Sequence, residues 1–532
     1  MKRTGFFLAI KFIALLLYYS SRPAWCADKI TEISGVVFED LNHNGIQDMG
    51  EKGITGILVS NQSDISSTDE TGRYSLPLGA DESVIYVIKP AAYEVPLDEN
   101  KLPQFYYIHK PQGSKNLYYG GIEPTGDLPG NLNFPLIPIL PSDTFHVAVL
   151  ADPQTRTLEE VHYLRDDIVA ELPGTGALFG IALGDIMFDD LSLFNEYDRT
   201  MAMAGFPVFH VPGNHDFDHH PDSVHNTPDT YIKHLGPDYY AFEYGQVSFI
   251  MLNTVDWMEE QSNKYYRNYR GSVPENQLHW ISNYLDFIDE DRLIVFCMHI
   301  PLYTMDSLVQ QNHIDNLNQL MELVKGRKHL LAISGHMHAL ENFYLDATLG
   351  WNAPEPFQVI TCATAAGGWW HGPRDERGIP ASLQMNDGTP NGYHIFRFTG
   401  NTYQQRFKAA GKDENYQLRI SAPHGIIHRD ETDSVLVAVN FFNGNDLAEL
   451  TYTLNDSISG SMQRTPMKDP FAERYYSKNK SYFEPWMSVG VSSHMWAAYL
   501  PENLSAGMHK LGVVAKDEYG NEYQQTAIFE IK

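Results

Sequence analysis

Five short apolar runs in the middle of the chain are each followed by a polar residue of a kind that binds metal ions. The runs cover residues 145–151, 178–183, 208–211, 293–298 and 329–334. Such runs are typical of buried strands in a parallel sheet. Stretches with helical spacing lie between them, at 157–171, 276–287 and 317–324. The alternation predicts an α/β fold in which the carboxyl ends of the strands meet at one edge and bind the ligand.

The stretch 208–216 shows the pattern most clearly. Pro212 and Gly213 stop the apolar run and allow a sharp backbone turn. The turn then presents Asn214, His215 and Asp216 together. Taken alone, these residues are equally well explained as a polar turn without function. The neighbouring strand ends favour a functional site.

The other strand ends carry the same kinds of side chain. A single histidine after an apolar strand is more often a hydrogen-bonding residue than a ligand, but core packing does not require five such ends in succession. Oxygen and imidazole ligands suit Mn, Fe or Zn. Two such metals that share a carboxylate would clamp a phosphoryl group and activate a water molecule. The candidate ligands are Asp152, Gln154, Asp185, Asn214, His299, His336 and His338.

The order of these motifs resembles the calcineurin-like metallophosphoesterase superfamily. The resemblance covers about residues 145–400 and rests on Asp-x-Gln, Gly-Asp, Gly-Asn-His-Asp, a later His and Gly-His-x-His. It implies a β-sandwich core flanked by helices. It also implies that His215 protonates the leaving oxygen or stabilises the phosphoryl oxygens, and that Asp216 orients His215. The metals would be held by Asp152, Asp185 and His338 on one side and by Asp185, Asn214, His299 and His336 on the other.

Gln154 departs from the superfamily pattern, since most members carry a histidine at this position. An amide oxygen is a weaker ligand than an imidazole, so the affinity and identity of the first metal depend on this residue. A subset of the superfamily uses the same Asp-Pro-Gln form. The substitution is therefore not interpreted as inactivation.

Residues 28–141 read as an all-β domain that contains a calcium-binding pattern. Short alternating runs are separated by Gly, Asn and Asp turns. One loop has oxygen side chains at positions one, three, five, nine and twelve and a glycine at six, which is the spacing of a calcium loop. It resembles the loops of bacterial surface β-sandwich repeats; the alternative is a solvated Asn/Asp turn. The candidate ligands are Asp40, Asn42, Asn44, Asp48 and Glu51.

The predicted catalytic domain covers residues 142–404, and a second β-sandwich domain covers 405–532. No helical periodicity is apparent after about residue 405. With both flanking domains, the chain resembles a bacterial three-domain subgroup of exported calcineurin-like phosphoesterases. Glycine-punctuated loops around Trp369, Trp370 and His371 either shape a substrate pocket or are packed hairpin turns.

The N-terminus reads as a secretory signal peptide over residues 1–27. Lys2 and Arg3 precede an apolar run that is too short to span a bilayer, and small residues follow it. Cys26 adds lipid anchoring as an alternative to soluble export. The protein is therefore expected to be periplasmic or on the cell surface, with no transmembrane span. Cys297 and Cys362 lie in apolar runs and are expected to be buried, unpaired thiols.

The chain is strongly acidic, with a formal net charge of −29. Nonspecific nucleic-acid binding needs a basic surface, so no nucleic-acid partner is expected. The sequence predicts an exported dinuclear-metal phosphoesterase that acts on a phosphomonoester or phosphodiester by metal-hydroxide attack. Its substrate would be a phosphorylated small molecule or envelope component. The competing interpretation is an envelope-surface binding protein with a structural, non-catalytic metal centre.

Overall fold

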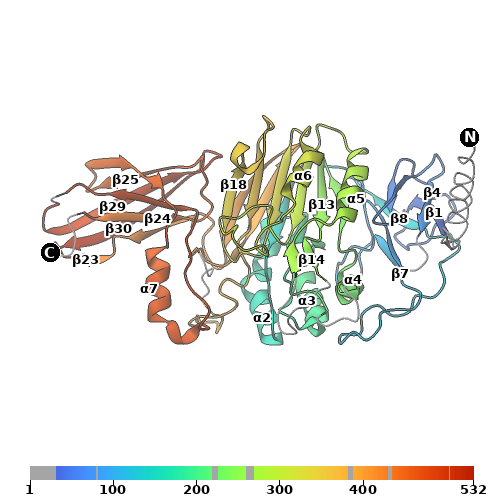
Figure 1. Cartoon of the computed structure of the whole chain (residues 1–532), viewed down its shortest axis with the longest axis horizontal. Helices are drawn as coiled ribbons and strands as arrows, with labels where there is room; N and C mark the ends of the chain where they lie inside the picture. The colour runs from blue at the N-terminus through green and yellow to red at the C-terminus, as the bar shows by residue number, and fades with distance from the viewer. Residues whose placement is uncertain are drawn as a thin grey trace, which may run out of the picture.

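The computed structural model describes residues 31–78, 82–218, 226–258, 269–380, 387–428, 434–502 and 504–532. The predicted signal peptide, with Cys26, lies outside these residues. Three parts follow one another along the long axis of the molecule: an N-terminal β-domain in blue, a central domain and a C-terminal β-domain in red (Figure 1).

The central domain is built from two sheets packed face to face. The first has the order β11-β10-β9-β20-β21, and the second has the order β12-β13-β16-β17-β19-β18. In the first sheet, the parallel strands are β9 (Thr144–Leu150), β10 (Phe179–Ala182) and β11 (Val208–His210). In the second, they are β13 (Val247–Leu252), β16 (Leu293–Met298), β17 (Leu330–Ser334) and β19 (Phe357–Thr361).

Antiparallel strands complete both sheets. The first sheet ends in the hairpin of β20 (Gly392–Thr399) and β21 (Thr402–Ala409). The second is edged by β12 (Tyr240–Tyr244) and β18 (Glu341–Leu345). The predicted boundary between residues 404 and 405 therefore falls inside β21, and the catalytic sheet continues to Ala409.

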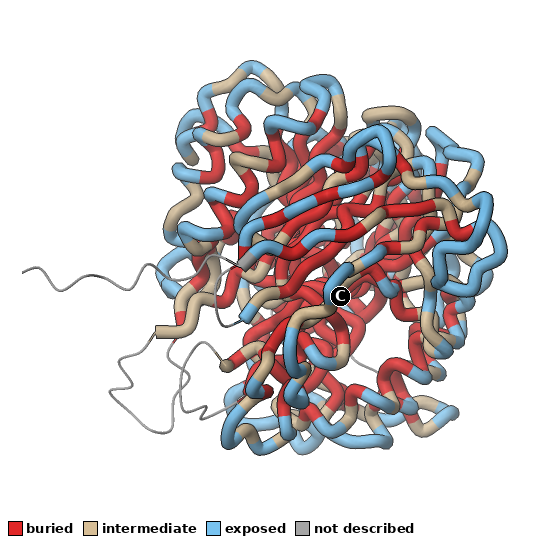
Figure 2. Tube along the Cα trace, turned by 90° about the vertical axis from the view of Figure 1, so that its right-hand side faces the viewer, coloured by how far each residue is buried: buried red, intermediate tan, exposed pale blue. Residues whose placement is uncertain are grey.

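Aromatic side chains fill the space between the two sheets. The rings of Phe209 and Phe242, one from each sheet, stack with centroids 3.8 Å apart, and Phe179 meets Phe249 edge-on at 5.4 Å. Every residue of β10, β13 and β16 is buried, which explains their continuous apolar sequences. Buried residues fill the interior of the molecule, whereas exposed ones concentrate at its periphery (Figure 2).

Helices cover the outer faces of the sandwich. On the first sheet lie α2 (Leu158–Asp167), the 3₁₀ segment η1 (Val169–Thr175), the short turn η2 (Leu191–Leu193) and α3 (Phe194–Ala202). On the second lie α5 (Glu275–Leu285) and α6 (Leu317–Val324). The chain also forms α4 (Asp229–Leu235), the turn η4 (Ala347–Leu349) and a small hairpin of β14 (Val255–Trp257) and β15 (Tyr269–Gly271). The predicted α/β fold is thus confirmed as a helix-flanked sandwich.

The N-terminal domain is a sandwich of two four-stranded sheets, β4-β1-β8-β6 and β3-β2-β5-β7. It contacts the catalytic domain, because the indole N–H of Trp280 in α5 donates to the hydroxyl of Ser60 in this domain at 3.0 Å. The strands are β1 (Thr31–Glu39), β2 (Leu58–Ser60), β3 (Ile65–Ser67), β4 (Arg73–Leu78), β5 (Ser83–Val87), β6 (Tyr93–Glu94), β7 (Tyr106–His109) and β8 (Phe134–Pro138).

The C-terminal domain is a second sandwich, with sheets β22-β24-β28-β27 and β23-β30-β29-β25-β26. Its strands are β22 (Leu418–Ala422), β23 (Gly425–Ile427), β24 (Leu436–Phe441), β25 (Glu449–Leu454), β26 (Ile458–Ser461), β27 (Gln463–Arg464), β28 (Met495–Tyr499), β29 (Gly507–Lys516) and β30 (Glu522–Ile531).

One expectation for the C-terminal domain was wrong, because it contains a helix. Helix α7 (Pro470–Lys478) is followed by the turn η5 (Lys480–Tyr482). Asp469 caps α7 by accepting a hydrogen bond from the amide of Phe471, and Pro470 occupies the first turn. An Asp-Pro pair of this kind is a local signal for a helix start. The helix is too short for its apolar spacing to stand out from the strands around it.

Both cysteines of the predicted mature chain are buried and unpaired, as expected: Cys297 lies in β16 and Cys362 follows β19. Within the described part of the chain, no helix is both long and apolar enough to cross a membrane.

A buried carboxyl in α3 gives the fold a pH-dependent stability. Asp198 is 4% exposed, and burial followed by the charge of Asp98 raises its pKa to about 8. The folded protein therefore holds this proton up to about pH 8, whereas an unfolded aspartate loses it near pH 4. Stability consequently falls as the pH rises from about 4 to 8.

Asp198→Asn is expected to remove this fall by replacing the ionisable group with a neutral one of the same shape. Thermal unfolding should show a midpoint raised by several degrees at pH 8, at about 2–4 °C per kcal/mol, and by less at pH 5. Glu196→Gln, an exposed change in the same helix, is the control. An equal shift at both pH values would contradict the explanation.

Candidate metal centre

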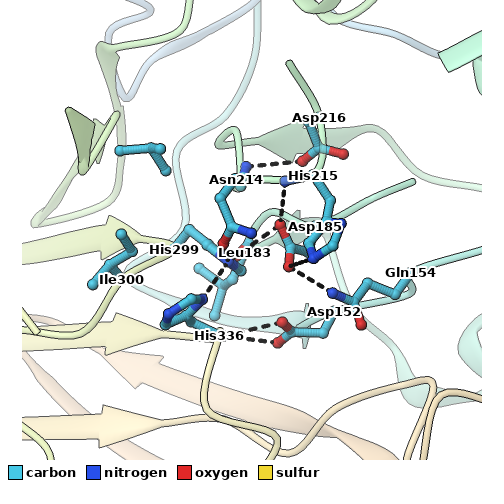
Figure 3. A network of polar contacts seen from close by, with 12 residues as sticks. Asp152, Gln154, Leu183, Asp185, Asn214, His215, Asp216, His299, Ile300 and His336 are labelled. Carbon is cyan, nitrogen blue, oxygen red and sulfur yellow. Dashed lines mark hydrogen bonds and ion pairs between the residues drawn. The ribbon is translucent and has the colours of Figure 1, made fainter. Parts of the chain in front are cut away.

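The seven predicted ligands come together at one edge of the sandwich. Figure 3 shows six of them: Asp152, Gln154, Asp185, Asn214, His299 and His336. Asp152 and Gln154 follow β9, Asp185 follows β10 and Asn214 follows β11, all from the first sheet. The second sheet supplies His299 after β16 and the pair His336 and His338 after β17. The carboxyl ends of parallel strands from both sheets therefore face one another across the site.

Half of the site is formed by Asp185, Asn214, His299 and His336. Ligand atoms of Asp185, His299 and His336 all lie within 4.8 Å of one another. Nε2 of His299 lies 3.3 Å from Oδ1 of Asp185, 3.2 Å from the side-chain oxygen of Asn214 and 3.1 Å from Nδ1 of His336. Four ligand atoms thus point at one small volume.

Backbone carbonyls orient both of these imidazoles. Nδ1 of His299 lies 2.8 Å from the carbonyl of Leu183, and Nε2 of His336 lies 3.0 Å from the carbonyl of Gln311. In the neutral ring the outer nitrogen carries the proton and donates it to the carbonyl, which leaves the lone pair of the inner nitrogen directed into the site. This arrangement is typical of histidines that bind metals.

The other half of the site contains two buried acceptors that no described residue satisfies. Nδ1 of His338 lies 3.1 Å from the carbonyl of Gly367, but its Nε2, 3.7 Å from Oδ1 of Asp152, has no hydrogen-bond partner. The amide nitrogen of Gln154 donates to Oδ2 of Asp185 at 2.7 Å, whereas its oxygen is buried and unpartnered. Buried polar atoms are normally paired, so an orphaned oxygen and nitrogen next to two carboxylates fit a bound cation.

The pKa values of the candidate ligands are strongly shifted by burial and by the neighbouring charges. Burial raises the pKa of Asp152 to about 7 and lowers those of His336 and His338 to about 3. For His299, burial is outweighed by the charges of Asp185 and Asp152, which raise the pKa to about 9. A divalent cation would stabilise the carboxylates and require neutral imidazoles.

The backbone around the site is strained. Left-handed φ angles at residues other than glycine are uncommon, and they concentrate where function overrides local preference. Gly213 in the same region cannot carry a side chain, because a Cβ atom would lie 2.1 Å from the amide nitrogen of Asp185. Positive φ occurs at five of the ligands: Asp152 (46°), Gln154 (40°), Asp185 (48°), His336 (74°) and His338 (48°).

His215 lies against Asp185 with one ring nitrogen free to face the site. Its backbone amide donates to Oδ1 of Asp185 at 2.9 Å, and its Nε2 is 3.9 Å from Oδ2. Its Nδ1 lies 2.8 Å from Oδ1 of Asp189, and its ring packs on Phe188 with centroids 4.3 Å apart. Asp189 thus orients the imidazole and leaves Nε2 available for proton transfer.

This geometry corrects the role expected of Asp216. The carboxylate of Asp216 accepts the amides of Met187 at 2.9 Å and Gly213 at 2.8 Å, and it points away from the His215 ring (Figure 3). It fixes the turn that carries Asn214 rather than the tautomer of His215. The sequence shows Asp189 only as one of two adjacent aspartates after the Gly-Asp motif.

The Trp369, Trp370 and His371 loop borders the half of the site that contains Gln154 and His338, but its members differ. Trp370 is 4% exposed and donates its indole N–H to the carbonyl of Pro153 at 2.9 Å, so it supports the strand end. Trp369 stacks on the ring of His338, with centroids 3.8 Å apart. Nε2 of His371 lies 3.7 Å from the carboxylate of Glu484 in the C-terminal domain.

The predicted calcium loop lies in the N-terminal domain, and hydrogen bonds from its own side chains fix its conformation. Asp40 is 1% exposed and accepts the amides of Asn44 and Gly45 at 3.1 and 2.8 Å. Asp48 accepts the side-chain amides of Asn42 and Asn44, both at 2.8 Å. The carboxylate of Glu51 accepts the amides of Leu41 and Asp48, which closes the loop.

Comparisons with known proteins agree with the fold and the layout. Family models match in three consecutive stretches: the N terminal of Calcineurin-like phosphoesterase at residues 41–121, Calcineurin-like phosphoesterase at 145–340, and the C terminal of Calcineurin-like phosphoesterase at 360–523. A search of curated proteins found no match.

Among solved structures, the chain is similar to a dimetal phosphatase from Danio rerio, which is 16% identical, with a TM-score of 0.36. That match covers 50% of this chain and 96% of the other. A purple acid phosphatase from yellow lupin seeds is 12% identical, with a TM-score of 0.35, and the match covers 67% of this chain and 69% of the other. The three consecutive family matches identify the chain as a member of the calcineurin-like phosphoesterases, a metal-dependent phosphoesterase with that family's N-terminal and C-terminal domains on either side.

Proposed function

We propose that the protein is an exported phosphoesterase that uses two divalent transition metals, Mn, Fe or Zn, to hydrolyse a phosphomonoester or phosphodiester. When bound, such a pair supplies Lewis acidity to the phosphoryl oxygens and to the attacking water. The observation that carries the proposal is the convergence of seven ligands on two sites, with unpartnered atoms on Gln154 and His338. One metal would be held by Asp152, Gln154, Asp185 and His338, and the other by Asp185, Asn214, His299 and His336.

His215 is the group placed to handle the proton of the leaving oxygen. Asp189 holds Nδ1, so the proton moves to and from Nε2. This nitrogen faces the carboxylate of Asp185. Burial lowers the pKa of His215, and the nearby carboxylates, first among them Asp185, oppose that fall. An ion pair with Asp189 would stabilise the imidazolium form of His215 before its proton passes to the leaving oxygen.

The function is tested by loading the purified protein with Mn, Fe or Zn, counting metal per chain and assaying aryl and alkyl phosphate monoesters and diesters. We expect close to two metals per chain and turnover that chelation abolishes. A fully loaded protein that turns over no ester in this set would contradict the catalytic proposal and favour a structural metal centre.

Export rests on the N-terminal sequence alone. We propose that residues 1–27 are removed and that the mature protein acts on phosphorylated small molecules or envelope components. Sequencing the N-terminus of the mature protein from its native cell is decisive. A start at Ala27 or Asp28 supports soluble export, a lipidated Cys26 indicates an anchor, and an intact Met1 contradicts both.

We further propose that the loop from Asp40 to Glu51 binds a structural calcium ion. Its five oxygen-bearing side chains already hydrogen-bond around one turn, with the spacing that calcium requires. Calcium is expected to raise the unfolding midpoint of the wild type by several degrees. A calcium concentration 100 times Kd increases the free energy of unfolding by about 2.7 kcal/mol. Asp40→Ala should abolish the shift, and Asp69→Ala in a different turn should keep it. A shift that survives in Asp40→Ala would place calcium elsewhere.

A further inference from the structure

We propose that Trp369 and Trp486 form a subsite for a flat ring beside the metal centre, and that the enzyme prefers phosphate esters whose leaving group carries such a ring. The inference rests on the proposed phosphoester hydrolysis. It adds the chemical class of the substrate and assigns part of the binding site to the C-terminal domain.

Trp369 is fixed directly against the metal centre. Its ring lies parallel to that of His338, with centroids 3.8 Å apart and planes 15° from one another. The same loop ties itself to this ligand through the carbonyl of Gly367, which meets Nδ1 of His338 at 3.1 Å. Trp369 adopts a φ of 50°, a conformation that a bulky side chain does not take without compensation.

The ring of Trp486 stands almost perpendicular to that of Trp369, so that the two rings form a corner. Trp486 is 53% exposed, and its ring meets that of Trp369 at 76° with centroids 4.8 Å apart. A large aromatic surface left in water next to a reaction centre is typical of a binding site. Two rings at nearly a right angle can hold a third flat ring by stacking on one and touching the edge of the other.

Trp486 belongs to a segment of the C-terminal domain in which the next residue, Met487, is buried. Helix α7 and the residues after it form a small core of Ala472, Tyr476, Met487 and Val489, against which Trp369 also packs. Buried side chains of the same domain form hydrogen bonds with the catalytic domain. Nε2 of His494 lies 3.0 Å from Asp387, and Arg419, paired with Asp469 at 2.6 Å, also donates to the carbonyl of Gly388. The corner therefore lies between two domains that buried hydrogen bonds connect.

Two charged residues, Arg156 and Glu484, lie close to His215 and to the Trp369 loop, respectively. The guanidinium of Arg156 lies 4.1 Å above the ring of Phe188, whose other contact is the ring of His215. The carboxylate of Glu484 lies 3.7 Å from Nε2 of His371. Burial lowers the pKa of Arg156, and the charges of Glu160 and then Glu484 oppose that fall. A leaving group protonated by His215 would extend along this side toward Trp486, with Arg156 and Glu484 available for polar substituents.

Both a nucleobase and a pyranose present a flat face to tryptophan, so ring stacking alone does not separate a nucleotide from a sugar phosphate. The experiment measures kcat/KM on the metal-loaded enzyme for phenyl phosphate, a nucleoside 5′-monophosphate, a hexose phosphate and glycerol phosphate, which has no ring. The reported quantity is the ratio of each ring ester to glycerol phosphate. Changes in metal loading affect numerator and denominator together and cancel.

Trp486→Ala is expected to lower the phenyl phosphate ratio about 10-fold, mainly through KM, because stacking binds ground state and transition state alike. Trp486→Phe should restore most of it. Tyr482→Ala is the matched control: Tyr482 is 52% exposed in the same segment and makes no ring contact with any described residue. Its ratios should equal those of the wild type.

The nucleotide and hexose arms identify the source of the ring, since the ratio of the natural class should fall with that of phenyl phosphate. Unchanged ratios for all three ring esters in Trp486→Ala would overturn the subsite while leaving the phosphoesterase intact. Absence of turnover for every ester, glycerol phosphate included, in the wild type would overturn the proposed function itself, and the subsite with it.

Discussion

Asp185→Asn is expected to lose at least one of the two metals and to lower kcat/KM by about 10³-fold or more. Asp185 is the residue that touches both halves of the site. Its Oδ2 accepts the amide of Gln154 at 2.7 Å, and its Oδ1 lies 3.3 Å from Nε2 of His299. Asparagine keeps the size of the side chain but loses the charge, and a neutral oxygen bridges two divalent cations poorly.

Metal content measured after dialysis separates this effect from simple misfolding. Wild type should retain close to two metals per chain, and Asp185→Asn should retain one or none while its unfolding midpoint in the presence of chelator matches that of the chelated wild type. Asp190→Asn is the matched control, because Asp190 lies five residues along the chain and caps a turn through the amide of Ser192. Two retained metals and near-normal turnover in Asp185→Asn would remove it as the bridge.

The residue pattern at strand ends was enough to predict which side chains meet. Each buried strand is a continuous apolar run, and each ligand follows one within a few residues, so the prediction depends only on local sequence and on the rule that parallel strands end at one edge. That rule does not say that the strands are shared between two sheets. His299 and Asp185 approach from opposite sheets, and this pairing is set by long-range packing of rings such as Phe209 on Phe242.

Residues that act through orientation were harder to predict. Asp216 follows His215 directly in sequence, yet its carboxylate turns back to the amides of Met187 and Gly213, while Asp189, 26 residues earlier, reaches the ring. Adjacent side chains on a tight turn point in different directions, so proximity in sequence is a poor guide to contact. Trp486 gave no signal at all, because its role depends on how the C-terminal domain docks against the Trp369 loop.

His215→Ala is expected to lower kcat about 10²- to 10⁴-fold for alkyl phosphates, the range that general acid catalysis typically contributes. The loss should be much smaller for p-nitrophenyl phosphate, because nitrophenolate leaves without needing a proton. Both metals should remain bound, since the contact of this residue with Asp185 is made by its backbone amide, which alanine keeps. A uniform loss across leaving groups would assign His215 to stabilising phosphoryl oxygens instead.

Asp189→Asn and Asp216→Asn then distinguish orientation of the acid from support of the turn. Asp189→Asn keeps an acceptor for Nδ1 but removes the negative charge 2.8 Å from it that stabilises the imidazolium. The kcat for alkyl phosphates should therefore fall about 10- to 100-fold, with the same leaving-group dependence as His215→Ala. Asp216→Asn instead weakens acceptors for two buried amides and should lower stability and metal retention without that dependence. Combining His215→Ala with Asp189→Asn should add almost nothing to His215→Ala, because an orienting carboxylate has no effect once the ring it orients is gone. Additive losses in the double variant would mean that Asp189 acts on the reaction independently of His215.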